Sequence, residues 1–337
     1  MEVINKYMEY GGCLHFELGM SITDGYFKKY NNQRIDVDSG RSALQYIIEN
    51  YNFKRIWLPV YNCPLVGKRI SEVGDIEIKW YNLENDFSPQ ISNERFCVGD
   101  ALLWVNYCGI MPASLIDKVA NMQKEIPVKI IIDNIQAYFS EPRMDVLNIY
   151  SCRKFLGVPD GGHIIGNDIK IKELLRYSTA DNYLYLLKAI ETGSNSVYGD
   201  YQISEKRFSE ANIVYGMPLL TERVLSNINY ENVIARRKAN FIELHLRLQD
   251  SNRLIIDTST ITPSVYPYLT SDGELREKLL DNSIYISRFW KHVLTNEFSN
   301  LFERDLAEYL IPLPIDQRYN IEDMDYIADK VIELLRA

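Results

Sequence analysis

Short runs of apolar residues alternate with amphipathic helical patterns through the first half of the chain. The apolar runs are mostly continuous and end at polar or glycine positions, which is typical of strands covered on both faces of a sheet. Strands are therefore predicted at residues 56–61, 76–81, 102–107, 129–133, 146–151 and 163–166. Helical periodicity predicts helices at residues 41–50 and 113–125. This alternation indicates an α/β fold with a mostly parallel sheet sandwiched by helices.

The second half of the chain predicts a smaller α+β domain. Its pattern is mostly helical over residues 168–248, including one long segment at 219–248. Beyond it we expect strands at 253–257 and 284–289, a turn at 262–269, and helices at 272–281 and 321–335. The predicted boundary falls between residues 209 and 219, and divides the chain into domains of residues 1–215 and 216–337.

The composition excludes several classes of protein. The chain has 337 residues, of which 46% are hydrophobic and 25% charged, so it is neither disordered nor fibrous. A net charge of −9 argues against a nucleic-acid partner. No apolar run approaches the ~18 residues of a membrane span, and the polar residues 1–10 lack the apolar stretch of a signal peptide.

The spacing of cysteine and histidine predicts free thiols and no metal site. The five cysteines are odd in number and scattered, which favours a reducing cytoplasm over a disulfide framework or a structural zinc. The four histidines show no ligand spacing. The basic cluster of Arg236, Arg237 and Lys238 is interpreted as a solvated or intersubunit face of the long helix.

A lysine follows the predicted strand at 146–151 and precedes a glycine-rich turn. Lys154 stands three residues after Ser151, and Gly161 and Gly162 lead into the next strand. A lysine on such a turn can project into a cleft, where loss of hydration lowers its pKa and makes it an amine nucleophile. The hydroxyl of Ser151 and the guanidinium of Arg153 suit an anionic group such as phosphate. The alternative is a surface lysine in a hairpin, which is the commoner case.

An acidic residue ends the predicted strand at 129–133. Asp133 stands at the carboxyl end of that strand, where open α/β sheets bind ligands, and Gln136 follows three residues later. Its carboxylate suits a cationic ring nitrogen or a metal ion. The alternative is a helix N-cap, a position at which Asp is favoured.

Small residues open the first predicted helix. Ser39, Gly40, Arg41 and Ser42 stand at its start. A helix N-terminus offers unpaired backbone N–H groups and a favourable dipole to an anion. The alternative is a simple Ser or Gly cap.

In this order and spacing, the three segments resemble the pyridoxal-phosphate (PLP) enzymes of the aspartate-aminotransferase fold. Within that fold the chain most resembles the sugar aminotransferases of the DegT/DnrJ/EryC1/StrS family. Further matching segments are Leu58-Pro-Val-Tyr-Asn-Cys63, Val105-Asn-Tyr-Cys-Gly109 and Leu313-Pro-Ile-Asp-Gln317. The resemblance covers residues 38–166 well and the remainder loosely. It implies the PLP-dependent transferase fold, with a sheet of the seven-stranded type.

The resemblance implies a role for each of the candidate residues. Lys154 matches the lysine that binds the cofactor covalently and carries the substrate proton. Asp133 matches the acid that pairs with the protonated pyridine nitrogen, and Gln136 a residue near the ring hydroxyl. The residues that match the phosphate cup are Gly40, Ser151 and, through their backbone amides, Arg41 and Ser42.

The chain departs from the family pattern around the phosphate. The family usually has Gly-Thr where this chain has Gly40 followed by Arg41. Arg41 either adds a phosphate or substrate contact or points to solvent. The family's phosphate serine often lies five residues before the lysine, whereas Ser151 lies three before it.

The chain also departs from the pattern around the ring. Cys63 stands where an aromatic residue normally stacks on the cofactor, so either Tyr61 stacks instead or the ring rests on a smaller side chain. Asn106 matches the end of the next strand and is a further candidate for cofactor binding. The family's partner-subunit Asn has no clean match; the candidate positions are Asn195 and residues 215–217.

The resemblance implies a cytoplasmic PLP-dependent aminotransferase. It would transfer an amino group from glutamate to a nucleotide-linked keto-sugar, for surface polysaccharide or secondary-metabolite synthesis. Enzymes of this fold build each site from two chains, so a homodimer is expected. The N-terminal segment, with residues 11–15, is expected to cover the cofactor. The alternatives are a PLP enzyme of another reaction type, amino-acid-directed or dehydratase-like, and a non-catalytic PLP-binding regulatory protein.

Overall fold

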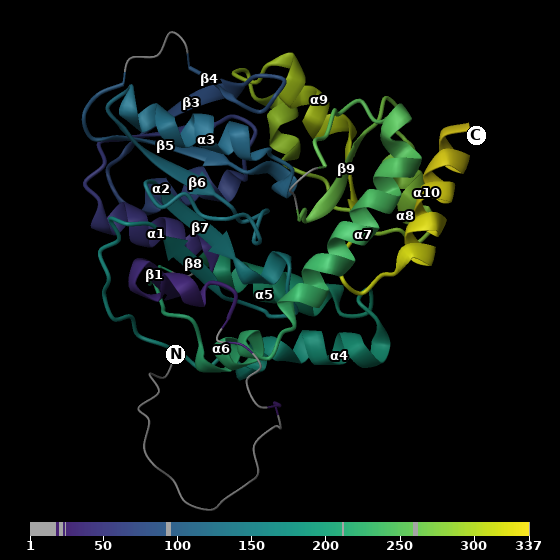
Figure 1. The fold of residues 1–337 in the computed structure, drawn as a ribbon, viewed down its shortest axis with the longest axis horizontal. Helices are drawn as coiled ribbons and strands as arrows, with labels where there is room; N and C mark the ends of the chain where they lie inside the picture. The colour runs from purple at the N-terminus through teal and green to yellow at the C-terminus, as the bar shows by residue number, and fades with distance from the viewer. Residues whose placement is uncertain are drawn as a thin grey trace, which may run out of the picture.

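One eight-stranded sheet forms the centre of the structure, and a two-stranded sheet lies beside it (Figure 1). The computed structural model describes residues 18–19, 23, 25–91, 96–210, 212–258 and 262–336. The strand order of the large sheet is β1-β8-β7-β6-β5-β2-β3-β4. Its strands are β1 (Arg34–Val37), β2 (Arg55–Pro59), β3 (Glu77–Leu83), β4 (Pro89–Gln90), β5 (Asp100–Val105), β6 (Val128–Asp133), β7 (Leu147–Ser151) and β8 (Gly162–Ile165).

The prediction of a mostly parallel sheet is confirmed. Five neighbouring strands, β7, β6, β5, β2 and β3, run parallel to one another. Strand β8 runs antiparallel to both β7 and β1, and β4 runs antiparallel to β3. Without the two-residue β4, the sheet has the expected seven strands. All six predicted strands are present, whereas β1 was not predicted because its alternating pattern spans four residues only.

Helices of the first half pack against the large sheet. Helix α1 (Gly40–Asn50) lies against β7 and β8, and α3 (Ala113–Asn121) lies against β6. Helix α2 (Pro64–Val73) packs on α1. Every residue of β5 and β7 is buried, as expected for strands with both faces covered. The carboxyl ends of the parallel strands therefore meet at one edge of a rigid sheet, where ligands bind in open α/β folds.

Four helices follow the large sheet in the chain. They are α4 (Leu184–Thr192), α5 (Tyr198–Glu210), α6 (Leu219–Ser226) and α7 (Tyr230–Leu248). The single long helix expected over residues 219–248 is therefore wrong, because the chain breaks between α6 and α7. The side chain of Asn229 accepts a hydrogen bond from the backbone N–H of Asn232 (3.0 Å), which caps α7 and starts a new helix there.

The C-terminal part is built on the small sheet. Strands β9 (Val265–Leu269) and β10 (Leu310–Pro314) pair antiparallel, and α7 packs on β9 and on α10 (Ile321–Arg336). The remaining helices are α8 (Leu275–Asp281) and α9 (Leu301–Tyr309). The final helix is confirmed within one residue.

Three expectations for the C-terminal part are wrong. Residues 253–257 and 284–289 form no strand, and the expected turn at 262–269 is largely strand β9. In the small sheet Pro267 lies opposite Pro312. Each strand of a two-stranded sheet has a free edge, so a proline that cannot donate a hydrogen bond is tolerated there. The prolines of this segment therefore led to the prediction of a turn where β9 forms, and β10 was not predicted.

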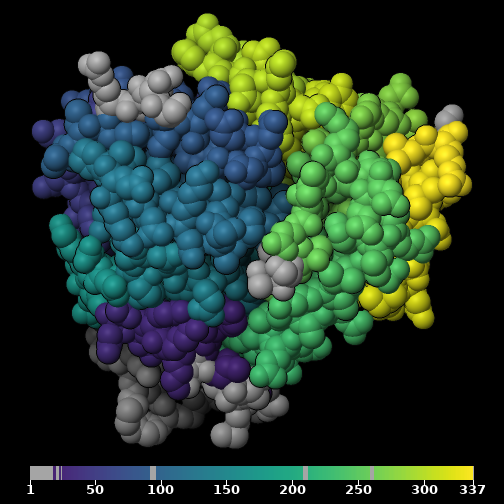
Figure 2. All heavy atoms as spheres, turned by 45° about the horizontal axis from the view of Figure 1, so that its top comes forward, coloured from purple at the N-terminus to yellow at the C-terminus, as the bar shows by residue number. Residues whose placement is uncertain are grey.

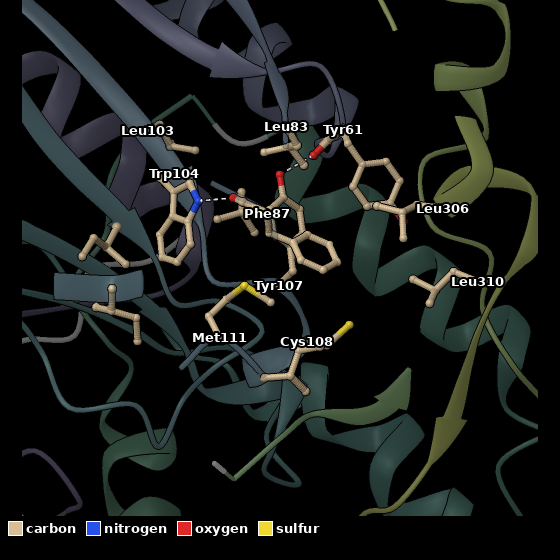
Figure 3. Close-up of a cluster of buried hydrophobic side chains, with 14 of the residues drawn as sticks. Tyr61, Leu83, Phe87, Leu103, Trp104, Tyr107, Cys108, Met111, Leu306 and Leu310 are labelled. Atoms are coloured by element: carbon tan, nitrogen blue, oxygen red, sulfur yellow. Dashed lines mark hydrogen bonds between the residues drawn. The ribbon is translucent and has the colours of Figure 1, made fainter. Parts of the chain in front are cut away.

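The core behind the parallel strands is rich in aromatic residues (Figure 3). The indole N–H of Trp104 donates to the carbonyl of Phe87 (2.9 Å), and the hydroxyl of Tyr107 donates to the carbonyl of Tyr61 (2.8 Å). The polar atoms of Trp104 and Tyr107 thus have partners, and the Tyr107 bond joins the residues that follow β2 and β5. Figure 2 shows the part of the chain that contains β2 to β6 (blue) beside the C-terminal part (green to yellow). No helix in the described ranges combines the length and the apolar character needed to cross a bilayer.

Candidate active site

Lys154 lies on the connection between β7 and β8. Strand β7 ends at Ser151, and a 3₁₀ turn, η4 (Cys152–Lys154), follows directly. The backbone N–H of Cys152 donates to the carbonyl of Gly161 (3.0 Å), so the connection is closed as a hairpin. This hydrogen bond holds the turn that carries Lys154 against the end of the sheet.

The two glycines before β8 are required by close packing. Gly161 has a φ of +98°, a conformation that residues with side chains rarely adopt. A Cβ at Gly162 would lie 2.8 Å from the carbonyl oxygen of Tyr150 and 2.9 Å from the carbonyl carbon of Ser39. The backbone at Gly162 therefore approaches the start of α1 closely, which brings the Lys154 turn and the α1 N-terminus together.

A cavity of about 360 Å³ lies beside this turn. It is within the ~300–1,000 Å³ typical of small-molecule sites. The candidate residues that line it are Lys154, Asp133, Gln136, Ser151, Gly40, Arg41 and Cys63. Those that do not line it are Ser42, Tyr61 and Asn106. The structure thus gathers residues from four separate segments of the chain around one space.

Lys154 lines the cavity and is exposed in this chain. Within the described ranges its ammonium group has no hydrogen-bond or ion-pair partner. Loss of hydration, followed by repulsion from the adjacent Arg153, lowers the pKa of Lys154. A lysine with a lowered pKa has more of its amine in the neutral form, the form that reacts with a carbonyl carbon.

Asp133 is the last residue of β6 and is buried. Its Oδ1 accepts a hydrogen bond from the backbone N–H of Ile135 (2.9 Å), whereas its second oxygen has no partner in the described part of the chain. Burial raises the pKa of Asp133 to about 7. No helix begins here, so the alternative of a helix N-cap is excluded. No group of three His, Cys, Asp or Glu side chains is placed to hold a metal in the described ranges.

The start of α1 forms the end of the cavity next to Ser151. A Cβ at Gly40 would lie 2.6 Å from Ile135 Cδ1 and 3.5 Å from Ser151 Cβ, so a larger residue here would force the Ile135 side chain to move. Ser39 caps the helix, since its hydroxyl accepts the backbone N–H of Ser42 (3.1 Å). That bond uses the Ser42 amide, which the resemblance assigned to the phosphate. The amides of Gly40 and Arg41 and the Ser151 hydroxyl remain for an anion.

Gln136 and Cys63 lie on the cavity wall. The side-chain oxygen of Gln136 accepts the backbone N–H of Cys108 (2.9 Å), and Cys108 has a φ of +55°. Gln136 therefore stabilises the strained turn after β5 in addition to facing the cavity. Cys63 is the N-cap residue of α2 and makes no side-chain capping bond.

Tyr61 and Asn106 are buried behind the wall. The ring of Tyr61 meets the ring of Trp290 edge-on, with centroids 4.5 Å apart. Trp290 and Phe289, from the C-terminal part, line the cavity in its place. The side-chain amide of Asn106 donates to Asn134 Oδ1 (2.9 Å). Both predicted residues thus support the wall from behind.

One wall of the cavity is cationic, and only part of it was predicted from the sequence. Arg153 makes a bidentate ion pair with Glu205 of α5, with Nη2–Oε2 at 2.8 Å. Arg41 Nη2 lies 3.6 Å from Glu205 Oε2. Arg69 of α2 also lines the cavity and is buried. Glu205 stands about fifty residues after Lys154 in a helix without any recognisable motif, so no local signal pointed to it.

The candidates for the family's partner-subunit Asn lie away from the cavity. Asn195 is exposed in the turn between α4 and α5, and Gly216 pairs with Val37 at the edge of β1. Neither lines the cavity. The segment of residues 11–15 lies outside the described residues.

The residues of the cavity fit PLP. The cofactor carries a carbonyl carbon for an amine, a cationic ring nitrogen and a phosphate. The cavity offers an unpartnered amine at Lys154, an unpartnered carboxylate oxygen at Asp133, and an open cup at Gly40 and Ser151. Each group of the cofactor therefore has a complementary residue on the same cavity.

Comparisons with known proteins extend this picture. No protein-family model matches the chain, and no curated protein matches it. Solved structures do match. A DegT DnrJ EryC1 StrS aminotransferase from Brucella abortus has 14% sequence identity and a TM-score of 0.62, covering 91% of this chain and 88% of that one. Spr1654 from Streptococcus pneumoniae has 14% identity and a TM-score of 0.65, covering 92% and 90%.

A third match is PseC of Helicobacter pylori, an aminotransferase involved in the biosynthesis of pseudoaminic acid. It has 15% identity and a TM-score of 0.61, covering 89% of this chain and 86% of that one. Similarity of this extent at such low identity concerns the path of the backbone. The chain therefore has the fold of the DegT/DnrJ/EryC1/StrS aminotransferases.

Proposed function

We propose that this protein is a PLP-dependent aminotransferase that transfers an amino group from glutamate to a keto-sugar carried on a nucleotide. One observation carries the proposal: Lys154 and Asp133 line the same cavity, and each has an unsatisfied polar atom there. One is an amine and the other an acid, yet they form no ion pair with each other.

The structural neighbours support the choice of cofactor and substrate class. Spr1654 has been solved in a PLP form and a PMP form. CalS13 of Micromonospora echinospora is a sugar aminotransferase with a TM-score of 0.61 to this chain. Both share the fold described above, and the cavity residues of this chain suit the same cofactor.

Asp133 would hold the ring nitrogen of the cofactor. A buried carboxylate that lacks a cationic partner is destabilised, which is why its pKa is raised to about 7. Pairing with a protonated ring nitrogen removes that penalty and keeps the proton on the ring. When bound, PLP supplies an electron-withdrawing ring that stabilises the charge left when a C–H proton leaves.

Lys154 would supply the reacting amine and then move the proton. Its Nζ has no partner in the described residues, and its lowered pKa favours the neutral amine that attacks a carbonyl carbon. The free Nζ would also be placed to accept a proton from one carbon and to return it to another. Proton transfer by a positioned side chain contributes on the order of 10²–10⁴-fold to rate.

The α1 N-terminus would orient the cofactor. The amides of Gly40 and Arg41 and the hydroxyl of Ser151 can bind its phosphate, while Asp133 binds the opposite end of the ring system. A cofactor held at these two places would be oriented relative to Lys154, which lines the same cavity. Fixing reactants in this way removes part of the entropic barrier.

A homodimer in the cytoplasm is part of the proposal. Several large apolar side chains are exposed on α4 and α5, among them Leu184, Leu187, Ile190, Tyr198 and Ile203. An exposed patch of this kind favours an interface with another chain. The free thiols at Cys63, Cys97, Cys108 and Cys152 suit a reducing compartment.

The test begins with the cofactor. The purified protein, incubated with PLP, is expected to absorb in the visible range, and borohydride should trap the cofactor on Lys154 in a peptide identified by mass spectrometry. Lys154→Ala is the control and should give neither signal. Addition of glutamate should then convert the cofactor to its PMP form. A folded protein with no visible absorbance and no trapped peptide would overturn the proposal; PLP binding without conversion by any amino donor would favour a regulatory protein.

A further inference from the structure

We propose that the cavity contains a second anion subsite, which binds a carboxylate or phosphate group of the substrate. It is formed by the side chains of Arg41 and Asn62 and by the N-terminus of α2. It is separate from the cup that α1 and Ser151 offer to the cofactor. The inference rests on the proposed function, because it assigns the subsite to the substrate that reaches Lys154.

Asn62 provides an unsatisfied donor in the cavity wall. Its side chain lines the cavity and is only 4% exposed. Its Oδ1 accepts the backbone N–H of Cys63 (2.7 Å), which sets the orientation of the amide. The Nδ2 group has no hydrogen-bond partner within the described part of the chain. A buried donor is normally satisfied, so Nδ2 calls for an acceptor from outside the described part of the chain, such as a ligand in the cavity.

The N-terminus of α2 lies directly after Asn62. The helix begins at Pro64 and has ten residues, and no side chain caps its start. Cys63, Leu65 and Val66 of this first turn line the cavity. The positive end of the helix dipole therefore faces the same space as the Asn62 amide, and both favour a negatively charged acceptor.

Arg41 adds a charge to the same wall. Its Nη1 is buried without a hydrogen-bond partner in the described ranges, and its Nη2 has only a long contact of 3.6 Å to Glu205. Glu205 is already held by the two nitrogens of Arg153. The guanidinium of Arg41 therefore keeps one nitrogen without an acceptor among the described residues, and guanidinium groups are well suited to bind oxyanions.

The charged residues of the cavity also favour an anionic ligand. Arg41, Arg69, Arg153 and Lys154 line it, against two carboxylates, Asp133 and Glu205. In the proposed function Asp133 pairs with the ring nitrogen of the cofactor, and the cofactor phosphate occupies the cup at α1. With Glu205 bound to Arg153, the α2 side of the cavity keeps an excess of positive charge. A substrate with a carboxylate or a phosphate would neutralise it.

The experiment measures anion binding to the protein loaded with PLP, in which the cofactor fills the cup. Calorimetric titrations use two probes, inorganic phosphate and the dicarboxylate glutarate. Whichever binds more tightly identifies the chemical class of the substrate group. The variants are Arg41→Gln, which removes the charge, and Asn62→Asp, which keeps the shape and the bond to Cys63 but repels an anion. Lys68→Met is the matched control, because Lys68 lies on the same helix with a side chain 60% exposed.

At least one probe should bind the loaded wild-type protein, and each cavity variant should weaken that binding by about tenfold to a hundredfold, the loss expected for one charge-assisted hydrogen bond. Lys68→Met should bind like wild type. Absence of binding to the loaded protein, or equal binding by the cavity variants, would overturn the inference. Thermal unfolding of each variant checks that it is folded.

Failure of the second anion subsite can be distinguished from failure of the proposed function. Failure of the function appears earlier, as absence of PLP absorbance. In that case the titrations are made on the protein without cofactor, where we expect two phosphate ions per chain and the loss of one of them in Arg41→Gln and in Asn62→Asp. A single phosphate that is unaffected by both variants would refute the second subsite.

Discussion

The guanidinium of Arg237 donates a hydrogen bond from Nη2 to the backbone carbonyl of Phe155 (3.1 Å), the residue that follows Lys154. Gln317 Nε2 donates to the same carbonyl (2.9 Å), and Arg237 Nε donates to Gln317 Oε1 (3.0 Å). The guanidinium also lies over the Phe155 ring, 4.7 Å from its centroid. Elements of the C-terminal part thus hold the turn that carries the candidate catalytic lysine.

Replacement of Arg237 should therefore affect both stability and the cofactor. Arg237 is 2% exposed, and Arg237→Met would leave the carbonyl of Phe155 with one donor fewer and Gln317 Oε1 without its donor. We expect a loss of roughly 2 to 4 kcal/mol in the free energy of unfolding, measured by urea denaturation, and weaker binding of PLP. The control is Arg236→Met at the exposed neighbouring position, which should change stability by about 0.5 kcal/mol or less. Equal effects of both variants would contradict this role.

Arg237 also shows where sequence reasoning failed and why. The cluster of Arg236, Arg237 and Lys238 was interpreted as a solvated or intersubunit face. Arg236 and Lys238 are indeed exposed, but Arg237 is buried on the face of α7 that includes Val233 and Phe241. A buried arginine is rare, and its partners are backbone carbonyls at positions 155, 263 and 264, far away in the sequence. Only the fold brings them together.

The structure of the first half of the chain was easier to predict, because the sequence patterns that determine it are local. Continuous apolar runs produce strands with two buried faces, and the residues at their carboxyl ends necessarily share one edge of a parallel sheet. That is why Asp133 and Lys154 line one cavity as the order of motifs indicated. Glu205 lies in no motif, and its role depends on Arg153 and Arg41, which come from other elements. Pro267 in β9 favoured the prediction of a turn where the structure has a strand.

The buried carboxylate of Asp133 predicts a pH dependence of stability in the protein without cofactor. Its pKa is raised to about 7 in the folded state, whereas an unfolded chain ionises near the ordinary value of 3.8. Between these values the folded state retains a proton that the unfolded state has lost, so stability falls as pH rises from about 4 to 7. The stability that the folded state has while Asp133 is protonated is present in full below pH 4 and is lost above pH 7 to 8.

Asp133→Asn removes this titration and keeps the bond to the amide of Ile135. Without cofactor, the variant should exceed wild type in unfolding free energy at pH 8 by roughly 2 to 4 kcal/mol, and the difference should vanish near pH 4. Chemical denaturation at several pH values measures it. Asp38 and Asp160 have pKa values raised to about 7 and about 6 by burial. They are present in both proteins, so the difference isolates Asp133. A difference independent of pH would contradict the assignment.

Substitution of Gly162 should disturb the packing of the site from behind. In Gly162→Ala the new Cβ would lie within 3 Å of backbone atoms of Tyr150 and Ser39, and neither strand β7 nor the start of α1 can yield easily. We expect a loss of roughly 1 to 3 kcal/mol in unfolding free energy, together with weaker PLP binding because the start of α1 must shift. Gly157→Ala is the matched control on the same connection, since a Cβ there meets nothing within 4 Å. If both variants lose the same unfolding free energy and bind PLP equally well, the close approach of the backbone at Gly162 does not determine the geometry of the site.

Glu205 should tune the amine of Lys154 through its charge. Its carboxylate raises the pKa of Lys154, against the larger lowering by burial and by Arg153. In Glu205→Gln that attraction is lost, so the pKa of Lys154 should fall further and its neutral amine should persist to lower pH. The measurement is the rate at which PLP becomes trappable on Lys154 by borohydride, followed from pH 5 to 9. The midpoint of this profile should move to lower pH in Glu205→Gln and stay in place in Glu191→Gln, an exposed position on α4. A shift to higher pH would mean that Glu205 acts on the lysine mainly by holding Arg153, because a released Arg153 that moves away would no longer repel the ammonium.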